Sequence, residues 1–302
     1  MTEPTKNKDG PPIHWGAYLG LLPIYLIALG IYIFTMGFTI WISLTNSKMI
    51  PVNNFTGLYQ YRRLFNDARW QISATNLGIY LVVFVGLSLA LGLLMAIFID
   101  QKIRFEGGFR TIFLYPQGMS FIVTGLVWQW ILNPQLGLEK VFHNMGFTGV
   151  SIDWLIRADT AIYVVGFAGV WQASGLVMAI MLAGLRGIDE DLSKAARVDG
   201  ISAYRYYRHI VIPLLTPMFA TALVLLSVGG VKVYDLVVAL TNGGPGISTE
   251  VPAKYVMEFL FRRANVGLAS AAASVMLITV AAVVIPYIYV SEFRKKRVRT
   301  PV

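Results

Sequence analysis

Two long apolar runs near the middle of the chain limit most strongly what it can fold into. They cover residues 161–184 and 214–240, and each is long enough to cross a bilayer as a helix. A polar segment, residues 185–213, separates them, and we call it the polar connection. The sequence therefore predicts two membrane-spanning helices joined by a polar connection.

Further apolar runs raise the prediction to six spans, at about 17–43, 76–100, 110–132, 161–184, 214–240 and 268–290. The 302 residues are 56% hydrophobic and 14% charged, with a mean hydropathy of +0.62, which excludes an ordinary soluble protein. The predicted fold is an all-α polytopic membrane protein. It comprises an N-terminal tail (1–16), a transmembrane domain (17–290) and a basic tail (291–302).

The Lys and Arg residues predict the orientation of the spans. The net charge of +9 arises in short segments between spans, so it does not indicate a nucleic-acid-binding protein. Six spans place both ends of the chain on one side, and basic residues are denser in the tails and the polar connection than in the other long loops. By the positive-inside rule these parts face the cytoplasm. We expect a multi-pass protein of the bacterial cytoplasmic (inner) membrane, with its basic tail on anionic lipid.

The polar connection has more structure than a turn between two spans needs. It is expected to form a helix, a break at Asp199 and Gly200, and a second helix that Pro213 ends. Acidic residues near the start of the first helix suit the helix dipole. We interpret the connection as a docking element that lies flat on the membrane face.

Two charges lie inside a predicted span. Lys232 and Asp235, with Tyr234 between them, are three residues apart and so are expected on one face of a helix. They form either a self-neutralising pair or part of a solute path. In the fourth span, Trp171 and Gln172 offer an aromatic face beside an amide, which suits a sugar, although packing between spans explains them equally well.

Signatures of catalysis are missing from the sequence. It has no metalloprotease, nucleophile-elbow or phosphate-loop motif, so we predict a chain that is not an enzyme and has no catalytic residues. It has no cysteine, and its three histidines, His14, His143 and His209, are scattered, so no metal site is expected.

Two motifs carry a resemblance to a known family. Within the polar connection, Ala-Ala, three residues, Gly, nine residues and Ile-x-x-Pro resemble the EAA loop of ABC-importer permeases, with Lys194 where Glu is usual. A second stretch after the fifth span resembles the outer-loop signature of sugar-type permeases. The resemblance implies ATPase-coupling residues Lys194, Ala195, Ala196, Arg197, Asp199, Gly200, Ile210 and Pro213, and signature residues Thr241, Asn242, Gly243, Gly244 and Pro245.

The chain is similar overall to the first permease subunit of maltose- and glycerol-phosphate-type sugar importers. The stretches Arg110–Pro116, Trp130–Pro134 and Trp171–Gly175 look most like glucose/mannose permeases. The resemblance implies a second permease chain, two ATPase subunits that bind ATP and Mg²⁺, and a solute-binding protein. The substrate path would include Trp171, Gln172, Lys232, Tyr234 and Asp235.

The predicted function is import of a sugar, either a monosaccharide such as glucose or mannose or a small glycoside. Two alternatives stay open. The intramembrane cation Lys232 would suit an anionic polyol or a sulfonated sugar. A membrane scaffold or sensor without transport activity also fits the missing catalytic signatures.

Overall fold

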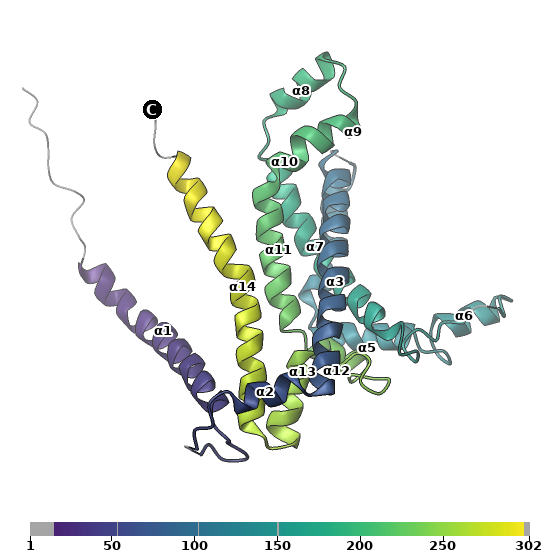
Figure 1. Ribbon diagram of the computed structural model, residues 1–302. Coiled ribbons are helices and arrows are strands. Elements are labelled where there is room, and N and C mark those ends of the chain that lie inside the picture. Colours follow the sequence, from purple (N-terminus) through teal and green to yellow (C-terminus); the bar gives the residue numbers. More distant parts are fainter. Residues whose placement is uncertain (1–14, 53, 102, 150, 299–302) are drawn as a thin grey trace, which may run out of the picture.

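The computed structural model describes residues 15–52, 54–101, 103–149 and 151–298 (Figure 1). Predictions for residues 1–14 and 299–302, and for the side chains of 290–298, lie outside what it describes. The described part is helical apart from its loops and one isolated bridge between Thr45 and Phe55. The predicted all-α fold is therefore confirmed.

The helices have the following bounds. They are α1 (Trp15–Ser43), α2 (Tyr59–Phe65), α3 (Ala68–Asp100), α4 (Glu106–Leu114), η1 (Tyr115–Gly118), α5 (Phe121–Ile131), α6 (Leu138–Asn144), α7 (Ala161–Leu185), α8 (Glu190–Val198), α9 (Ala203–Tyr206), η2 (Tyr207–Val211), α10 (Ile212–Leu214), α11 (Thr216–Val231), α12 (Asp235–Leu240), α13 (Pro252–Met257), η3 (Glu258–Arg262) and α14 (Val266–Val298).

Four single helices are long and apolar enough to cross a membrane: those over Gly20–Ser43, Ala68–Asp100, Ala161–Leu185 and Val266–Tyr289. They coincide with the first, second, fourth and sixth predicted spans. The second begins earlier than expected, at Ala68 rather than near residue 76, because the side chain of Asp67 accepts a hydrogen bond from the amide of Arg69 and caps the helix there.

The predicted third span, 110–132, is not one continuous helix. The structure divides it into Glu106–Gly118 and Phe121–Ile131, which meet at an angle of 102°. Pro116 lacks the amide hydrogen that would continue the ladder, and Met119 is extended. The hydroxyl of Ser120 then accepts a hydrogen bond from the amide of Val123 and starts α5 in a new direction.

The predicted fifth span, 214–240, is also not one continuous helix. A bend of 66° separates Ala203–Leu214 from Thr216–Val231, and the helix then stops before α12 begins at Asp235. Tyr234 has φ −135° and ψ −60°, which is not helical. Lys232 and Asp235 are therefore not on one face of one helix, contrary to the prediction.

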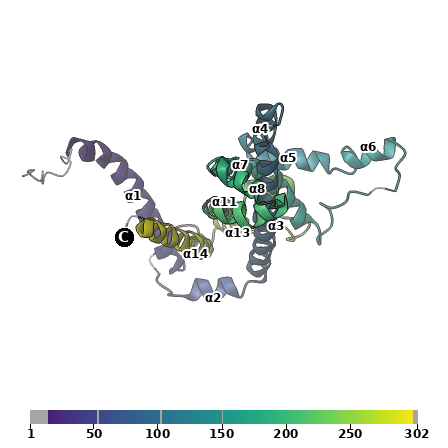
Figure 2. The same cartoon turned by 90° about the horizontal axis from the view of Figure 1, so that it is seen from above.

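The core forms around α7, which packs along α3 in the middle of the molecule (Figure 1). In the most apolar window of α7, 67% of the residues are buried, against 0% in α1. The stacked rings of Tyr80 and Phe84 on α3 belong to this core. Seen from above, α1 and α6 lie on opposite sides of the central bundle (Figure 2). Their apolar surfaces are therefore left for lipid or other chains.

Candidate functional site

The polar connection projects from one end of the bundle, and we call this end the α8 end (Figure 1). Its first helix, α8, is capped by Asp189, whose side chain accepts from the amide of Asp191. The helix ends in a left-handed residue, Gly200, with φ +68°. The amide of Ile201 donates to the carbonyl of Ala196 at 2.9 Å and fixes the turn. The predicted helix–glycine–helix unit is therefore present.

One detail of the polar connection differs from the prediction, because Pro213 does not end the second helix. After α9 the chain forms η2, a widened, π-helical turn. In it the amide of Ile212 donates to the carbonyl of Tyr207. Pro213 follows within α10, near the start of that short helix, where its missing amide hydrogen is tolerated. The helix breaks instead at Leu215, with φ −79° and ψ 0°.

Most of the predicted coupling residues lie on the surface of the α8 end. Ala196 is buried and Ile210 half-buried, whereas the others are exposed; these are Lys194, Ala195, Arg197, Asp199, Gly200 and Pro213. The Nζ of Lys194 lies 2.8 Å from the carboxylate of Asp191, one turn earlier on α8. Both side chains are well exposed, so this pair contributes little stability and Lys194 remains able to exchange partners.

A groove of about 1040 Å³ runs between the polar connection and the ends of α3 and α4. Its walls combine charges with apolar surface, including Glu106, Arg186, Arg197, Ile188 and Tyr206. The groove therefore has the mixed lining of a protein-docking surface.

Trp171 and Gln172 lie next to the bend between η1 and α5. The Nε2 of Gln172 donates to the carbonyl of Met119 at 2.7 Å, whereas its buried Oε1 has no partner among the described residues. The rings of Trp128 and Trp171 meet edge to face, with centroids 6.0 Å apart. Sequence reasoning missed Trp128, because its ring partner Trp171 lies on another helix, α7.

Lys232, Tyr234 and Asp235 lie at the break between α11 and α12. Lys232 and Asp235 are exposed and Tyr234 is half-buried. No ion pair joins Lys232 to Asp235 among the ion pairs of the described residues, so the self-neutralising pair is not formed here. The break instead leaves both charges accessible.

The signature residues 241–245 form a tight loop at the opposite end of the bundle, which we call the α2 end (Figure 1). The hydroxyls of Thr241 and Thr249 are 2.7 Å apart, and Thr249 donates to the carbonyl of Gly244 at 2.9 Å. Asn242 and Gly243 have positive φ, and Gly243 packs against the side chain of Lys254. Internal bonds therefore fix the conformation of the loop.

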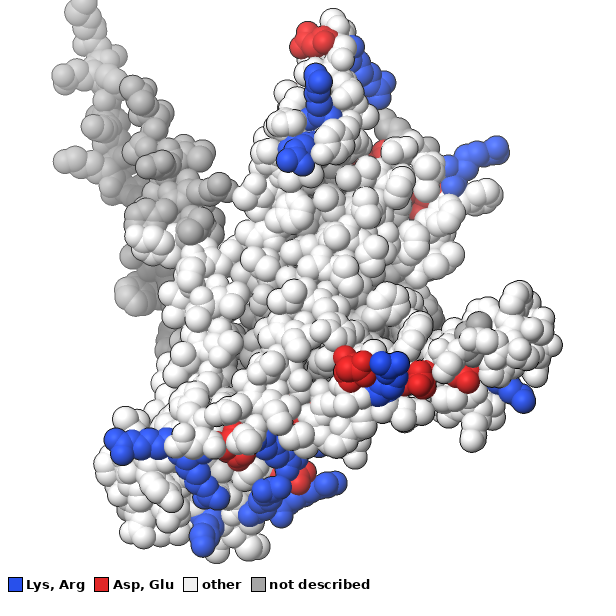
Figure 3. All heavy atoms as spheres, turned by 45° about the vertical axis from the view of Figure 1, so that its right-hand side comes forward, with Lys and Arg blue, Asp and Glu red and all other residues white. Residues whose placement is uncertain are grey.

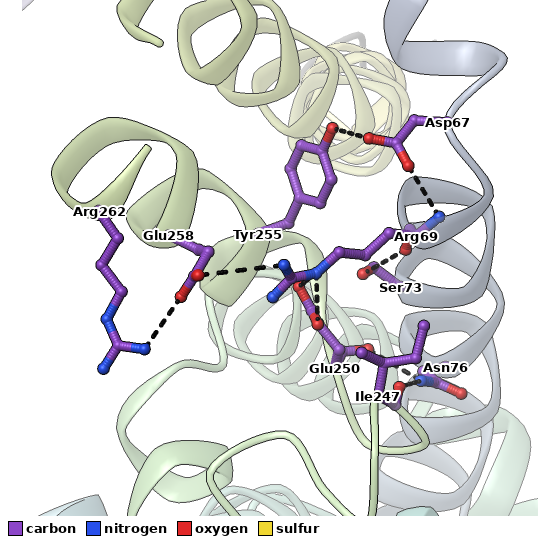
Figure 4. A network of polar contacts seen from close by, with 9 residues as sticks. All are labelled: Asp67, Arg69, Ser73, Asn76, Ile247, Glu250, Tyr255, Glu258 and Arg262. Carbon is purple, nitrogen blue, oxygen red and sulfur yellow. Dashed lines mark hydrogen bonds and ion pairs between the residues drawn. The ribbon is translucent and has the colours of Figure 1, made fainter. Parts of the chain in front are cut away.

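A polar network ties the segment that directly follows this loop to α3 (Figure 4). The Nε of Arg69 donates to both carboxylate oxygens of Glu250, at 2.7 and 2.8 Å, and Glu250 is only 1% exposed. Asn76 is buried and donates to the carbonyl of Glu250 at 2.9 Å. Sequence reasoning missed this network because its members are far apart in the chain.

Tyr255 extends the network on α13. Its hydroxyl donates to the carboxylate of Asp67 at 2.7 Å, and burial together with this bond raises the pKa of the phenol. On the face in Figure 3, charges gather at the α8 end and toward the α2 end, with a largely uncharged band between them. This distribution suits a chain that crosses a membrane.

Residues 88–299 match the model of the family described as "Binding-protein-dependent transport system inner membrane component". A probable ABC transporter permease protein of Pyrococcus horikoshii is 39% identical over 282 residues, covering 92% of this chain and 96% of its own. The xylose/arabinose import permease protein of Haloferax volcanii is 33% identical, covering 91% and 86%. The trehalose/maltose transport system permease protein of Thermococcus litoralis is 30% identical, covering 92% and 94%.

Among solved structures, a chain of a bacterial alginate ABC transporter, crystallised with an alginate pentasaccharide-bound periplasmic protein, has the same fold. Its TM-score is 0.74 at 18% identity, and the match covers 95% of this chain and 96% of that one. The curated relatives are permeases, which confirms that this chain is not an enzyme. The chain belongs to the family of inner membrane components of binding-protein-dependent transport systems.

Proposed function

We propose that this chain is the first permease subunit of an ATP-driven importer for a monosaccharide, such as glucose or mannose, or a small glycoside. The observation that carries the proposal is the helix–glycine–helix unit exposed at the α8 end beside a groove of about 1040 Å³. Relatives named for xylose/arabinose, for trehalose/maltose and for starch degradation products support a carbohydrate substrate.

In this proposal the α8 end faces the cytoplasm of a bacterial cell, and both ends of the chain lie on that side. The polar connection docks on one of two ATPase subunits, which bind ATP and Mg²⁺, while a second permease chain completes the path. A solute-binding protein delivers sugar at the α2 end. Closure of the ATPase pair then moves the spans as rigid bodies between two states, and each ligand shifts the equilibrium by its differential affinity.

The proposed substrate path runs from Trp171 and Gln172 to the break that exposes Lys232, Tyr234 and Asp235. The aromatic face of Trp171 suits the apolar face of a sugar ring. The unpartnered Oε1 of Gln172 and the carboxylate of Asp235 offer acceptors for hydroxyl groups. The amide also bonds to the bend at Met119, so the same residue holds the shape of the path.

The first test is purification of the tagged chain from its native membrane in mild detergent, with mass spectrometry of the proteins that accompany it. We expect a second multi-span permease, an ATPase and a binding protein. The assembled complex in liposomes should take up labelled sugar only when ATP is present. A chain that is recovered alone from detergent and from lipid nanodiscs, with no uptake defect on deletion, would instead favour a scaffold or sensor.

A second candidate substrate is an anionic polyol or a sulfonated sugar, because Lys232 is exposed and pairs with no carboxylate of the described chain. Replacing Lys232 with alanine removes the cation. If the substrate is anionic, uptake of the anion should fall by about tenfold or more, the effect of losing one charge-assisted hydrogen bond. Uptake of neutral sugar should not change. Equal loss of both would indicate that Lys232 supports the path rather than the charge of the substrate.

A further inference from the structure

We propose that Arg186 is a positioning residue that joins the polar connection to the bent helices α4 and α5, so that they move together; this rests on the proposed function. Arg186 directly follows α7, where the polar connection begins. Its Nη2 lies 2.6 Å from Oε1 of Glu106 on α4, and its Nε lies 3.8 Å from the carboxylate of Asp100, at the end of α3. One guanidinium therefore links the ends of three helices.

The electrostatics of this cluster favour that arrangement. Asp100 lies at the C-terminal end of α3, where a negative charge opposes the helix dipole, and the guanidinium of Arg186 offsets it. Glu106 lies in the first turn of α4, where a negative charge is favourable. Arg110 also approaches Glu106, at 3.7 Å, but from the same helix. Among the described ion pairs of the Glu106 carboxylate, only the one with Arg186 therefore joins two different helices.

Two further contacts hold α4 and η1 against α7 along their length. A Cβ added to Gly175 on α7 would collide with the carbonyl oxygen of Phe113, so the two backbones touch at that level. At the bend, Gln172 donates to the carbonyl of Met119 at 2.7 Å. Together with Arg186 and Glu106, these contacts attach the segment at its start, middle and end.

The attached segment leads from the α8 end to the opposite end of the molecule. Beyond the bend, α5 packs against α12, where Gly125 lies against Ala239. The signature loop directly follows α12, and Glu250 then ties that region to Arg69 on α3. A displacement of the polar connection therefore reaches α5 and α12 through α4, provided that the first link, between Arg186 and Glu106, holds.

The test uses the complete transporter in liposomes, with uptake and ATP hydrolysis measured on the same samples. Replacing Arg186 with methionine, or Glu106 with glutamine, should lower the sugar moved per ATP hydrolysed by about tenfold, the effect of one charge-assisted hydrogen bond. Because Arg186 and Glu106 also line the groove beside the polar connection, co-purification of the ATPase is measured for each variant, and the ratio is taken from complexes that retain it. Arg186→Lys, which preserves the charge, should restore most of the ratio.

Arg110→Met is the matched control, because it removes a charge next to Glu106 without removing a link between helices. It should transport like the unmodified chain. The double variant of Arg186→Met and Glu106→Gln should lose no more than either single variant, since both remove the same contact. Glu106→Gln keeps the size of the side chain, so it tests the link even if Arg186→Met lowers recovery of the protein.

Three results would overturn the inference: an unchanged uptake-to-hydrolysis ratio in Glu106→Gln, an equal loss in Arg110→Met, or additive losses in the double variant. Each of these results can be interpreted only if the unmodified complex couples ATP hydrolysis to sugar uptake. An unmodified complex that does not import sugar counts against the proposed function instead. Failure of the link and failure of the function are therefore distinguishable.

Discussion

Replacing Gly200 with valine is expected to leave the chain in the membrane but to separate ATP hydrolysis from sugar uptake. Gly200 has φ +68°, a conformation that a β-branched residue adopts only under strain. Non-glycine residues pay about 1–2 kcal/mol there, enough to shift the turn between α8 and α9 and to reduce uptake by about tenfold or more. Uptake and hydrolysis in liposomes measure the effect.

The cause of that loss can be isolated, because nothing lies within 4 Å of a Cβ built on Gly200. A clash of the added Cβ with the described chain is therefore excluded, which leaves backbone strain and a clash with a docked partner as the expected causes. Gly200→Asn is the control, since asparagine tolerates the left-handed conformation. It should retain most of the coupling. Full activity in Gly200→Val would contradict the proposed docking of the polar connection.

Replacing Arg69 with methionine is expected to destabilise the chain by about 3–5 kcal/mol, the usual effect of leaving a buried charge without its partner. Glu250 is 1% exposed, and both of its carboxylate oxygens accept a hydrogen bond from the guanidinium of Arg69. Without Arg69 its carboxylate loses that compensation in a low-dielectric site. Denaturant titration of the detergent-solubilised protein measures the change in the free energy of unfolding.

Two comparisons make that result specific. Arg62→Met removes an exposed arginine from α2 and should change the stability little. Adding Glu250→Gln to Arg69→Met removes the uncompensated charge and should recover part of the loss, because an unpaired charge is more unfavourable than an unpaired amide. A stability change in Arg69→Met no larger than that in Arg62→Met would show that the network of Figure 4 contributes little.

The long straight helices could be predicted because their signal is local. An unbroken apolar run must satisfy its backbone bonds within itself, and α1, α3, α7 and α14 follow from that requirement alone. The helix–glycine–helix unit of the polar connection was equally local, since Asp189 caps α8 and Gly200 ends it. Family membership followed from motifs in the same connection and in the signature loop.

The two bent spans could not be read from hydropathy, since an apolar run is equally apolar whether it is straight or broken. Pro116 and Ser120 were a local signal for the first bend, but neither fixes an angle of 102°. That angle is stabilised by the hydrogen bond from Gln172 to Met119, between α7 and the bend. Hydropathy also could not show that Lys232 and Asp235 lie on different sides of a helix break. Their spacing places them on one helix face only if the helix continues, and α11 ends before Lys232.

The sequence by itself determined that this chain is an all-α membrane protein with a helix–glycine–helix connection between two spans, because hydrophobic length and turn chemistry act over a few neighbouring residues. Only the tertiary structure decided which polar groups meet. Arg69 and Glu250 are 181 positions apart, and Glu106 and Arg186 are 80 positions apart. Contacts over such distances form only when helix packing brings the partners together, and no local pattern encodes them.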